Sequence, residues 1–473
     1  MIKQFLWVIV LLSLLLAGCE LGGSGSGNDN FEEADRTFWV QNTNTGRYYQ
    51  VEAVQLAGGK EDDACIVYGE LSAVNDKRIS RDTAEAVKQE FDQHIYGPIT
   101  CVFGPYKDFD GNGKLILFLL DIQDGYKPLS GSSYIAGYFN PIDTFPNRVY
   151  SFSNAADMIY LDIDPGIAGA AEFYSTIAHE FQHLINFSTR YNNKDLPDVQ
   201  DIWIDEGLAS AAEYIYSQEH GQGHIQMKID FFNKDKDYDN YPSAISQGNN
   251  FFTWVEDKNV YDEYATVYLF FQWLRIHADN GAGIYRDIIT AKDLNQAAVT
   301  KAAEKHIDRT FGDWETLLGT WLLANYVNAS SGTLGYTGKI ITKPVTIDDK
   351  SLGLSPGEGV FSGFSNSVTF SGPTEAEKIS FPSIRYIKVG VDGKTTSINE
   401  AGQTTGRSAD RLLTFNANTN SKRYIKIPIN IQGSETGKLT GVKAAGAGDK
   451  PADPERTAAP ALKPLPVDIR IRF

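Results

Sequence analysis

The hydrophobic pattern of the chain changes twice along its length, and this limits the fold more than any other feature. Residues 38–71 contain three short segments rich in β-branched and aromatic residues, and the segment LILFLLDI (115–122) begins with a continuous apolar run. The short segments predict strands, and the run predicts a strand covered on both faces. Residues 171–329 carry apolar side chains every three to four positions, which predicts packed helices. This segregation of strands and helices predicts an α+β fold.

The length of 473 residues exceeds what one hydrophobic core usually organises, so we expect more than one domain. Between the first strands and the apolar run, residues 81–96 predict a helix capped by Ser80. Beyond residue 330, short segments separated by glycine, serine and threonine predict a C-terminal antiparallel β-sandwich. We therefore expect an N-terminal α/β region (31–107), a central unit of mixed sheet and helices (108–329) and a β-rich domain (330–473).

The N-terminus has the pattern of a targeting segment. Lys3 precedes an apolar stretch from Phe5 to Ala17 that is too short to span a bilayer, and residues 19–30 form a polar tether. The stretch ends in Leu-Ala-Gly-Cys19, which resembles the lipobox of bacterial lipoproteins, where cleavage leaves an acylated cysteine. The resemblance implies a signal peptide (1–18), a lipid anchor on Cys19 and an extracytoplasmic position on a bacterial membrane. A plain signal peptide with an incidental cysteine is the alternative.

The net charge limits which macromolecules the protein can bind, and the cysteine content limits which disulfides it can form. The net charge of −17, with no basic stripe, repels phosphate backbones and argues against nucleic acid as a partner. Besides Cys19 the chain has Cys65 and Cys101, which have no cysteine neighbour at zinc-site spacing. A disulfide between these two cysteines and a pair of buried thiols remain equally open.

The segment AHEFQHLI carries the pattern of a metal site. His179 and His183 lie four residues apart on a predicted helix, so both imidazoles project from one face and can bind one cation. The alternative, an amphipathic helix with two surface histidines, conflicts with the apolar residues that surround the pair. A catalytic zinc ion needs a third protein ligand, and Glu180 is expected to act as general base toward water instead.

The segment WIDEGLASAAE supplies that third ligand through a family resemblance. Glu206 follows His183 by 23 positions, and HExxH followed by WxxEGxA resembles the gluzincin peptidases and the aminopeptidase-N group in particular. In that group this glutamate binds zinc. The whole arrangement is most similar to the hyicolysin family of bacterial zinc peptidases, which implies a zincin-type catalytic unit over about residues 108–329.

Two further acids follow from the position of Glu206. Glu213 lies two helical turns on and on the same face, where it either orients a metal ligand or remains a solvated carboxylate. Asp205 is expected to be a helix N-terminal carboxylate, with Gly207 allowing a tight turn after Glu206.

The oxyanion of peptide hydrolysis needs a hydrogen-bond donor. In the aminopeptidase-N group a tyrosine serves, ten positions before a leucine, and Tyr264 and Leu274 reproduce that spacing. A packing role for Tyr264 is the alternative, since the chain has 24 tyrosines, and Tyr261 is the substitute candidate.

A second cation, calcium, is suggested only weakly. Asp108, Asp110, Asn112 and Gly113 follow the opening spacing of an EF-hand loop, but the twelfth position is Leu119 instead of a bidentate glutamate. A plain turn is the favoured interpretation.

These features together indicate a lipid-anchored zinc endopeptidase that acts on polypeptides. The chain lacks the GxMEN segment with which aminopeptidases hold a free α-amino group, so the site gains nothing from a chain end. The segment MIYLD (158–162) is expected to be a strand whose edge pairs with an extended substrate. A non-catalytic, zinc-binding surface adhesin on a peptidase fold remains the alternative.

Overall fold

The computed structural model describes residues 34–127, 134–166, 170–191, 200–220, 223–234, 252, 261–343, 352–354, 356–363, 369–370, 373, 375–399, 404–405, 410–419, 425–427 and 438–439. Cys19, the expected signal peptide and the tether lie outside these residues. Within them, no helix is long and apolar enough to cross a membrane.

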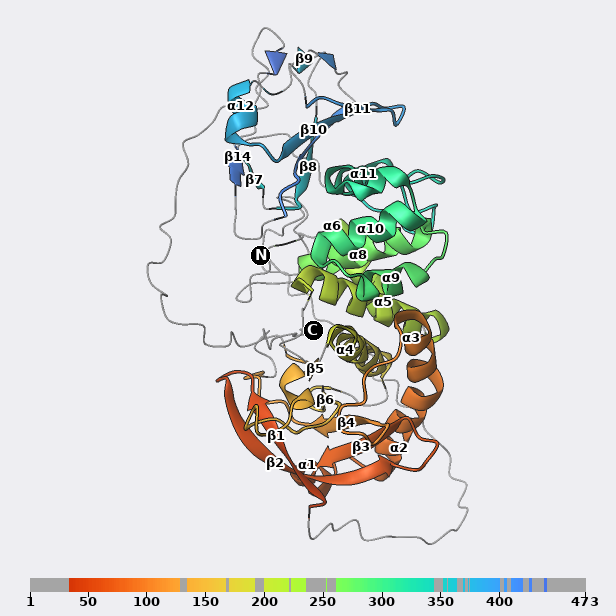
Figure 1. Cartoon of the computed structure of the whole chain (residues 1–473), viewed down its shortest axis with the longest axis vertical. Helices are drawn as coiled ribbons and strands as arrows, with labels where there is room; N and C mark the ends of the chain where they lie inside the picture. Colours follow the sequence, from red (N-terminus) through yellow and green to blue (C-terminus); the bar gives the residue numbers. More distant parts are fainter. Residues whose placement is uncertain are drawn as a thin grey trace, which may run out of the picture.

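A curled, six-stranded mixed sheet forms the N-terminal part of the molecule (Figure 1). Its strands are β1 (Arg36–Asn42), β2 (Arg47–Gly58), β3 (Cys65–Glu70), β4 (Leu115–Leu120), β5 (Gly137–Phe139) and β6 (Met158–Asp162). The order across the sheet is β1-β2-β3-β4-β6-β5. β3, β4 and β6 run parallel, while β1, β2 and β5 pair antiparallel with their neighbours. All six residues of β4 are buried, as expected for a central strand.

Helices cover one face of this sheet and then form a layer of their own (Figure 1). Those that follow the first strands are α1 (Leu71–Asn75), α2 (Arg81–Glu90), a π-helical turn (Phe91–Ile95) and α3 (Tyr96–Phe103). The larger group is α4 (Ala171–Arg190), α5 (Ile202–His220), α6 (Gly223–Lys234), α8 (Tyr261–His277), α9 (Gly283–Thr290), α10 (Asn295–His306) and α11 (Trp314–Val327). Short 3-10 turns occur at Pro141–Thr144 and Arg309–Gly312. Ser80 caps α2 by accepting a hydrogen bond from the Thr83 N–H, as the sequence predicts.

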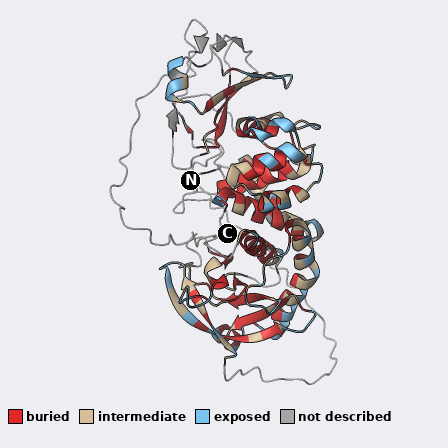
Figure 2. Cartoon of the chain, in the orientation of Figure 1, coloured by how far each residue is buried: buried red, intermediate tan, exposed pale blue. Residues whose placement is uncertain are grey.

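Alternation along the strands divides the apolar side chains between two cores. In β4 and β6, Leu117, Leu119 and Ile159 join the large core beneath α2, α3 and α4, whereas Phe118 and Tyr160 join a smaller core on the other face. The smaller core is closed by the curl of β1 and β2, which bring further aromatic and β-branched residues. Figure 2 shows that α4 and the central strands are buried almost throughout. The metal-binding pattern therefore lies on an internal helix.

A separate antiparallel sheet follows the helices. Its four strands have the order β11-β10-β13-β8. The elements of this part are β7 (Leu352–Leu354), β8 (Gly359–Gly363), β9 (Thr369–Phe370), α12 (Glu375–Ser380), β10 (Ile384–Val389), β11 (Thr395–Ser397), β12 (Thr404–Thr405), β13 (Arg411–Asn416), β14 (Ile425–Ile427) and β15 (Lys438–Leu439). Tyr326 of α11 stacks on Phe361 of β8 with ring centroids 4.6 Å apart, so the sheet packs on α11. A complete sandwich stays a prediction.

Two expectations need correction. The segment MIYLD is β6, but it is not an edge strand, because the short strand β5 pairs with its outer side. The disulfide alternative is wrong, since both Cys65 and Cys101 are free. Cys65 begins β3 and is fully buried in the core, whereas Cys101 lies on the exposed side of α3.

Candidate metal centre

The centre lies between two antiparallel helices, α4 and α5. The first part of α4 faces the later part of α5, because His179 lies beside Glu213, and the end of α4 faces the start of α5, because Asn186 bonds to Asp205. The two histidines lie four residues apart on α4 and so share the face toward α5.

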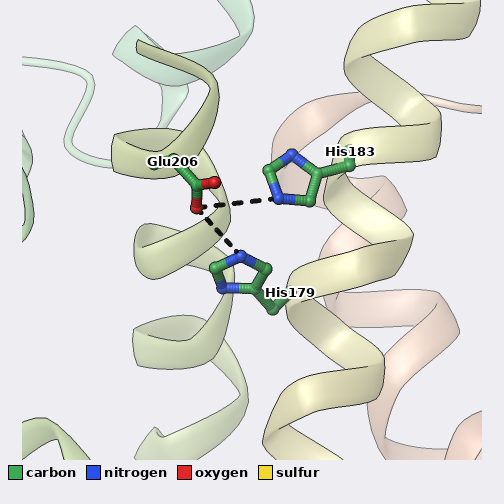
Figure 3. Close-up of side chains that lie close together, drawn as sticks. All are labelled: His179, His183 and Glu206. Atoms are coloured by element: carbon green, nitrogen blue, oxygen red, sulfur yellow. Dashed lines mark ion pairs between the residues drawn. The ribbon is translucent and has the colours of Figure 1, made fainter. Parts of the chain in front are cut away.

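His179, His183 and Glu206 converge at this interface (Figure 3). Glu206 Oε2 lies 3.2 Å from His179 Nε2 and 3.8 Å from His183 Nε2. One ligand atom from each residue lies within 4.8 Å of the other two, and all three side chains are buried. The structure therefore brings together the three residues that the sequence assigns to the metal.

The three facing atoms fit a bound cation. Apart from their approach to one another, His179 Nε2, His183 Nε2 and Glu206 Oε2 are buried without a hydrogen-bond partner among the residues that the structure describes. Leaving such polar atoms without partners is costly, and a cation satisfies all three. Two imidazole nitrogens and one carboxylate oxygen form the donor set of catalytic zinc sites in which a fourth position serves water or substrate.

Glu180 adds a reactive carboxylate beside this cluster. Its Oε2 accepts a hydrogen bond of 2.9 Å from the Phe139 N–H of β5, while its buried Oε1 has no hydrogen-bond partner within the described part of the chain. Burial raises the pKa of Glu180 to about 7. The carboxylate is thus fixed through one oxygen, and the other oxygen remains available to take a proton.

Comparisons with known proteins agree with this geometry. The chain is 26% identical over 364 residues to the Neutral metalloprotease ShpI of Staphylococcus hyicus, a stretch that is 75% of this chain and 76% of that protein. No model of a protein family matches the chain.

Glu213 contacts the ring nitrogen of His179 that faces away from the cluster. The Nδ1 of His179 lies 2.6 Å from Glu213 Oε1, so the sequence alternative in which Glu213 is a solvated carboxylate is wrong. Lys228 of α6 in turn donates to both Glu213 oxygens, at 2.7 and 2.8 Å, and to Ser210 at 3.0 Å. A hydrogen bond at Nδ1 fixes the ring and leaves Nε2 as the atom that faces the cluster.

His183 has a matching acidic neighbour that sequence reasoning missed. Asp205 lies in the first turn of α5, as expected, but its Oδ2 also lies 3.1 Å from His183 Nδ1. Asn186 donates to the other oxygen of this carboxylate. Burial raises the pKa of Asp205, but His183 and Asn186 outweigh it and hold the pKa below its usual range. The i, i+19 contact between Asn186 and Asp205 has no local sequence signal.

Tyr264 lies beside the centre on α8. Its ring centroid is 6.4 Å from that of His179, and its side chain is buried. Burial, and then the carboxylates of Glu206 and Glu180, raise the pKa of the Tyr264 hydroxyl well above its usual value. The hydroxyl is therefore a neutral donor near the cluster. Tyr261 begins α8, and its side chain lies outside the described residues.

The role expected for Gly207 needs correction. This residue lies inside α5, so it makes no turn after Glu206. A Cβ atom placed there would lie 2.4 Å from the ring of Phe271 on α8. Gly207 thus allows α5 and α8 to approach closely, which brings Tyr264 toward His179, His183 and Glu206.

The acidic loop proposed as a weak calcium candidate is a turn in the structure. Both oxygens of Asp108 accept backbone N–H groups within the loop, from Gly111 and Gly113. Asp108, Asp110 and Asp157 do come close enough to surround a cation, but exposed acidic groups commonly do so without one. The favoured interpretation as a plain turn agrees with these hydrogen bonds.

We expect Glu213→Gln to weaken zinc binding by about 10- to 100-fold. The neutral amide is a weaker hydrogen-bond acceptor for His179 Nδ1 than the charged carboxylate of Glu213. The zinc dissociation constant, measured by competition with a chromophoric chelator, checks this expectation. Glu304→Gln, an exposed change on α10, is the matched control. Equal affinities for the two variants would show that Glu213 does not support the metal site.

Proposed function

We propose that this protein is a zinc-dependent endopeptidase with a zincin-type catalytic unit. The observation that carries the proposal is the buried convergence of His179, His183 and Glu206, with Glu180 one residue from the first histidine. The likeness to a protein named a neutral metalloprotease supports a hydrolase of this class.

The proposed mechanism assigns a separate task to each side chain. His179, His183 and Glu206 would hold the zinc ion, which when bound supplies a Lewis acid for water and for the peptide carbonyl. Glu180, oriented by Phe139, takes a proton from the attacking water at Oε1 and returns it to the departing amine. Tyr264 donates its hydroxyl hydrogen to the developing oxyanion.

The position of β5 supports cleavage within a chain. β5 is an edge strand of the six-stranded sheet. Its Phe139 N–H points away from β6 and donates a hydrogen bond to Glu180. The outer side of β5 therefore faces the proposed base, and an extended peptide can lie along it through backbone hydrogen bonds. β5 takes the substrate-pairing role that the sequence analysis gave to β6. Extended or unfolded polypeptides are the proposed substrates.

A digestion experiment tests the proposed function. The purified protein is incubated with a denatured protein mixture, with and without a metal chelator, and the cleaved bonds are read by mass spectrometry. We expect cleavage that the chelator stops and zinc restores, with blocked peptides cut internally as fast as free ones. Removal of single residues from free N-termini alone would contradict an endopeptidase.

A non-catalytic surface adhesin that binds zinc is the competing proposal. Zinc binding needs only three ligands, so a binding protein has no use for a carboxylate held as Glu180 is. The same digestion separates the two functions. Bound zinc without any cleaved peptide bond would favour the adhesin.

We expect Tyr264→Phe to lower kcat with little change in KM, because the hydroxyl is proposed to act mainly in the transition state. The loss should be on the order of 10²-fold, as for removal of one oxyanion donor. Steady-state kinetics on an internally quenched peptide check this. Tyr261→Phe is the matched control, and a sensitive Tyr261 beside an indifferent Tyr264 would move the role three residues back.

A lipid anchor on Cys19 is proposed from the lipobox resemblance. We expect Cys19→Ser, expressed in a bacterium with its leader intact, to move the protein from the membrane to the soluble fraction, because acyl chains supply the anchor. Partitioning after cell fractionation, with Cys101→Ser as the control, is the measurement. Unchanged membrane partitioning would count against lipidation.

A further inference from the structure

A partly open cavity of about 190 Å³ lies next to the proposed substrate path. Thr176, one turn before Glu180 on α4, and Ala136, which directly precedes β5, both line it. Since the Phe139 N–H of β5 reaches Glu180, a peptide that pairs with the outer side of β5 lies beside Ala136, one of the residues that line this cavity. A cavity of roughly 150 Å³ can hold benzene, so this one can hold a long side chain.

The lining combines apolar walls with two carboxylates. Pro165 and Phe173 contribute apolar surface, and Asp162 and Glu172 contribute the carboxylates. Asp162 ends β6 and is 1% exposed, whereas Glu172 lies exposed in the first turn of α4. The described residues of the lining include no lysine, arginine or histidine.

Only one of the two carboxylate oxygens of Asp162 has a hydrogen-bond partner among the described residues. Its Oδ1 accepts the Ile122 N–H at 2.9 Å, but its buried Oδ2 has no hydrogen-bond partner in the part of the chain that the structure describes. Burial, and then the nearby acids Asp124 and Asp121, raise the pKa of Asp162 to about 8. A buried carboxylate in such surroundings is stabilised by a cation that satisfies its second oxygen.

The electrostatic balance of the cavity favours positive charge. Burial and the carboxylates of Asp162 and Glu172 contribute to raising the pKa of Tyr134, which also lines the cavity, to about 12. The N-terminus of α4 carries a partial positive charge of about +0.5, which repels a cation in the cavity. This charge is smaller than the negative charge of one carboxylate. Arg78 pairs with Asp121 at 3.0 Å and does not line the cavity.

We propose that this cavity binds the side chain of a lysine or arginine of the substrate, close to the bond that is cleaved. The apolar walls contact the methylene stem, and Asp162 and Glu172 bind the charged end. The proposal rests on the proposed function, because it assigns a substrate preference to the same catalytic centre.

Matched substrates test the preference. Blocked peptides carrying lysine or its uncharged analogue norleucine at each position around one cleavable bond are compared with the zinc-loaded, full-length protein. We expect kcat/KM to be at least about tenfold higher for lysine at one position. Asp162→Asn keeps the acceptor for the Ile122 N–H and should bring the lysine-to-norleucine ratio near one.

A second variant keeps the test decisive if Asp162→Asn does not fold. Glu172→Lys places a cation at the exposed side of the cavity and should bring the ratio below one, while Glu304→Lys on α10 leaves it unchanged. Equal cleavage of lysine and norleucine peptides by the wild-type protein at every position would overturn the inference and leave the peptidase proposal intact. Absence of any cleavage by zinc-loaded protein would instead contradict the peptidase proposal itself.

Discussion

Replacing Glu180 by glutamine is expected to lower turnover by about 10²- to 10⁴-fold while the protein keeps about one zinc per chain. The amide can still accept the Phe139 N–H through its oxygen, so the side chain and β5 keep their arrangement. It cannot take a proton from water at neutral pH. Zinc content by elemental analysis and kcat on a quenched peptide are the two measurements.

The control for this variant is Glu304→Gln, which neutralises an exposed carboxylate on α10. It should retain zinc and cleave uncharged peptides at the wild-type rate. Normal turnover in Glu180→Gln would remove the proposed base. Loss of zinc in that variant would mean that Glu180 supports the metal site instead.

The second large effect is expected for Glu206→Ala, which should lose zinc under conditions where the wild-type protein retains it. The substitution deletes one of the three proposed protein ligands and leaves a buried space beside the two histidines. Activity should disappear with the metal and recover in part when excess zinc is added. Zinc content after dialysis, together with residual activity, is measured.

Asp205→Ala is the informative comparison, because Asp205 is the adjacent acid and contacts His183 only at Nδ1. It should weaken zinc binding by about 10- to 100-fold, less than loss of a direct ligand. If Glu206→Ala kept its zinc while Glu213→Ala lost it, the direct ligand would be Glu213.

The three residues of the candidate metal centre could be predicted from the sequence because their spacing encodes their geometry. Helical periodicity places His179 and His183 on one face, and the resemblance to gluzincins supplies Glu206. The burial of α4 also follows from the apolar residues around the motif. These are properties of short segments, which sequence patterns describe well.

Contacts between segments could not be predicted in this way. Asp205 reaches His183, and Lys228 reaches Glu213, only because α4, α5 and α6 pack together. Similarly, β5 has only three residues, which are too few to show a periodic pattern in the sequence. The sequence therefore predicts the substrate-pairing edge at β6 instead of β5. Gly207 was assigned to a turn because its contact with Phe271 lies on a distant helix.

An anomalous difference map collected at the zinc absorption edge tests the central claim most directly. We expect one strong peak between α4 and α5, at about 2.0–2.2 Å from His179 Nε2, His183 Nε2 and a Glu206 oxygen. A peak at Asp108, Asp110 and Asp157 with none between the two helices would contradict it.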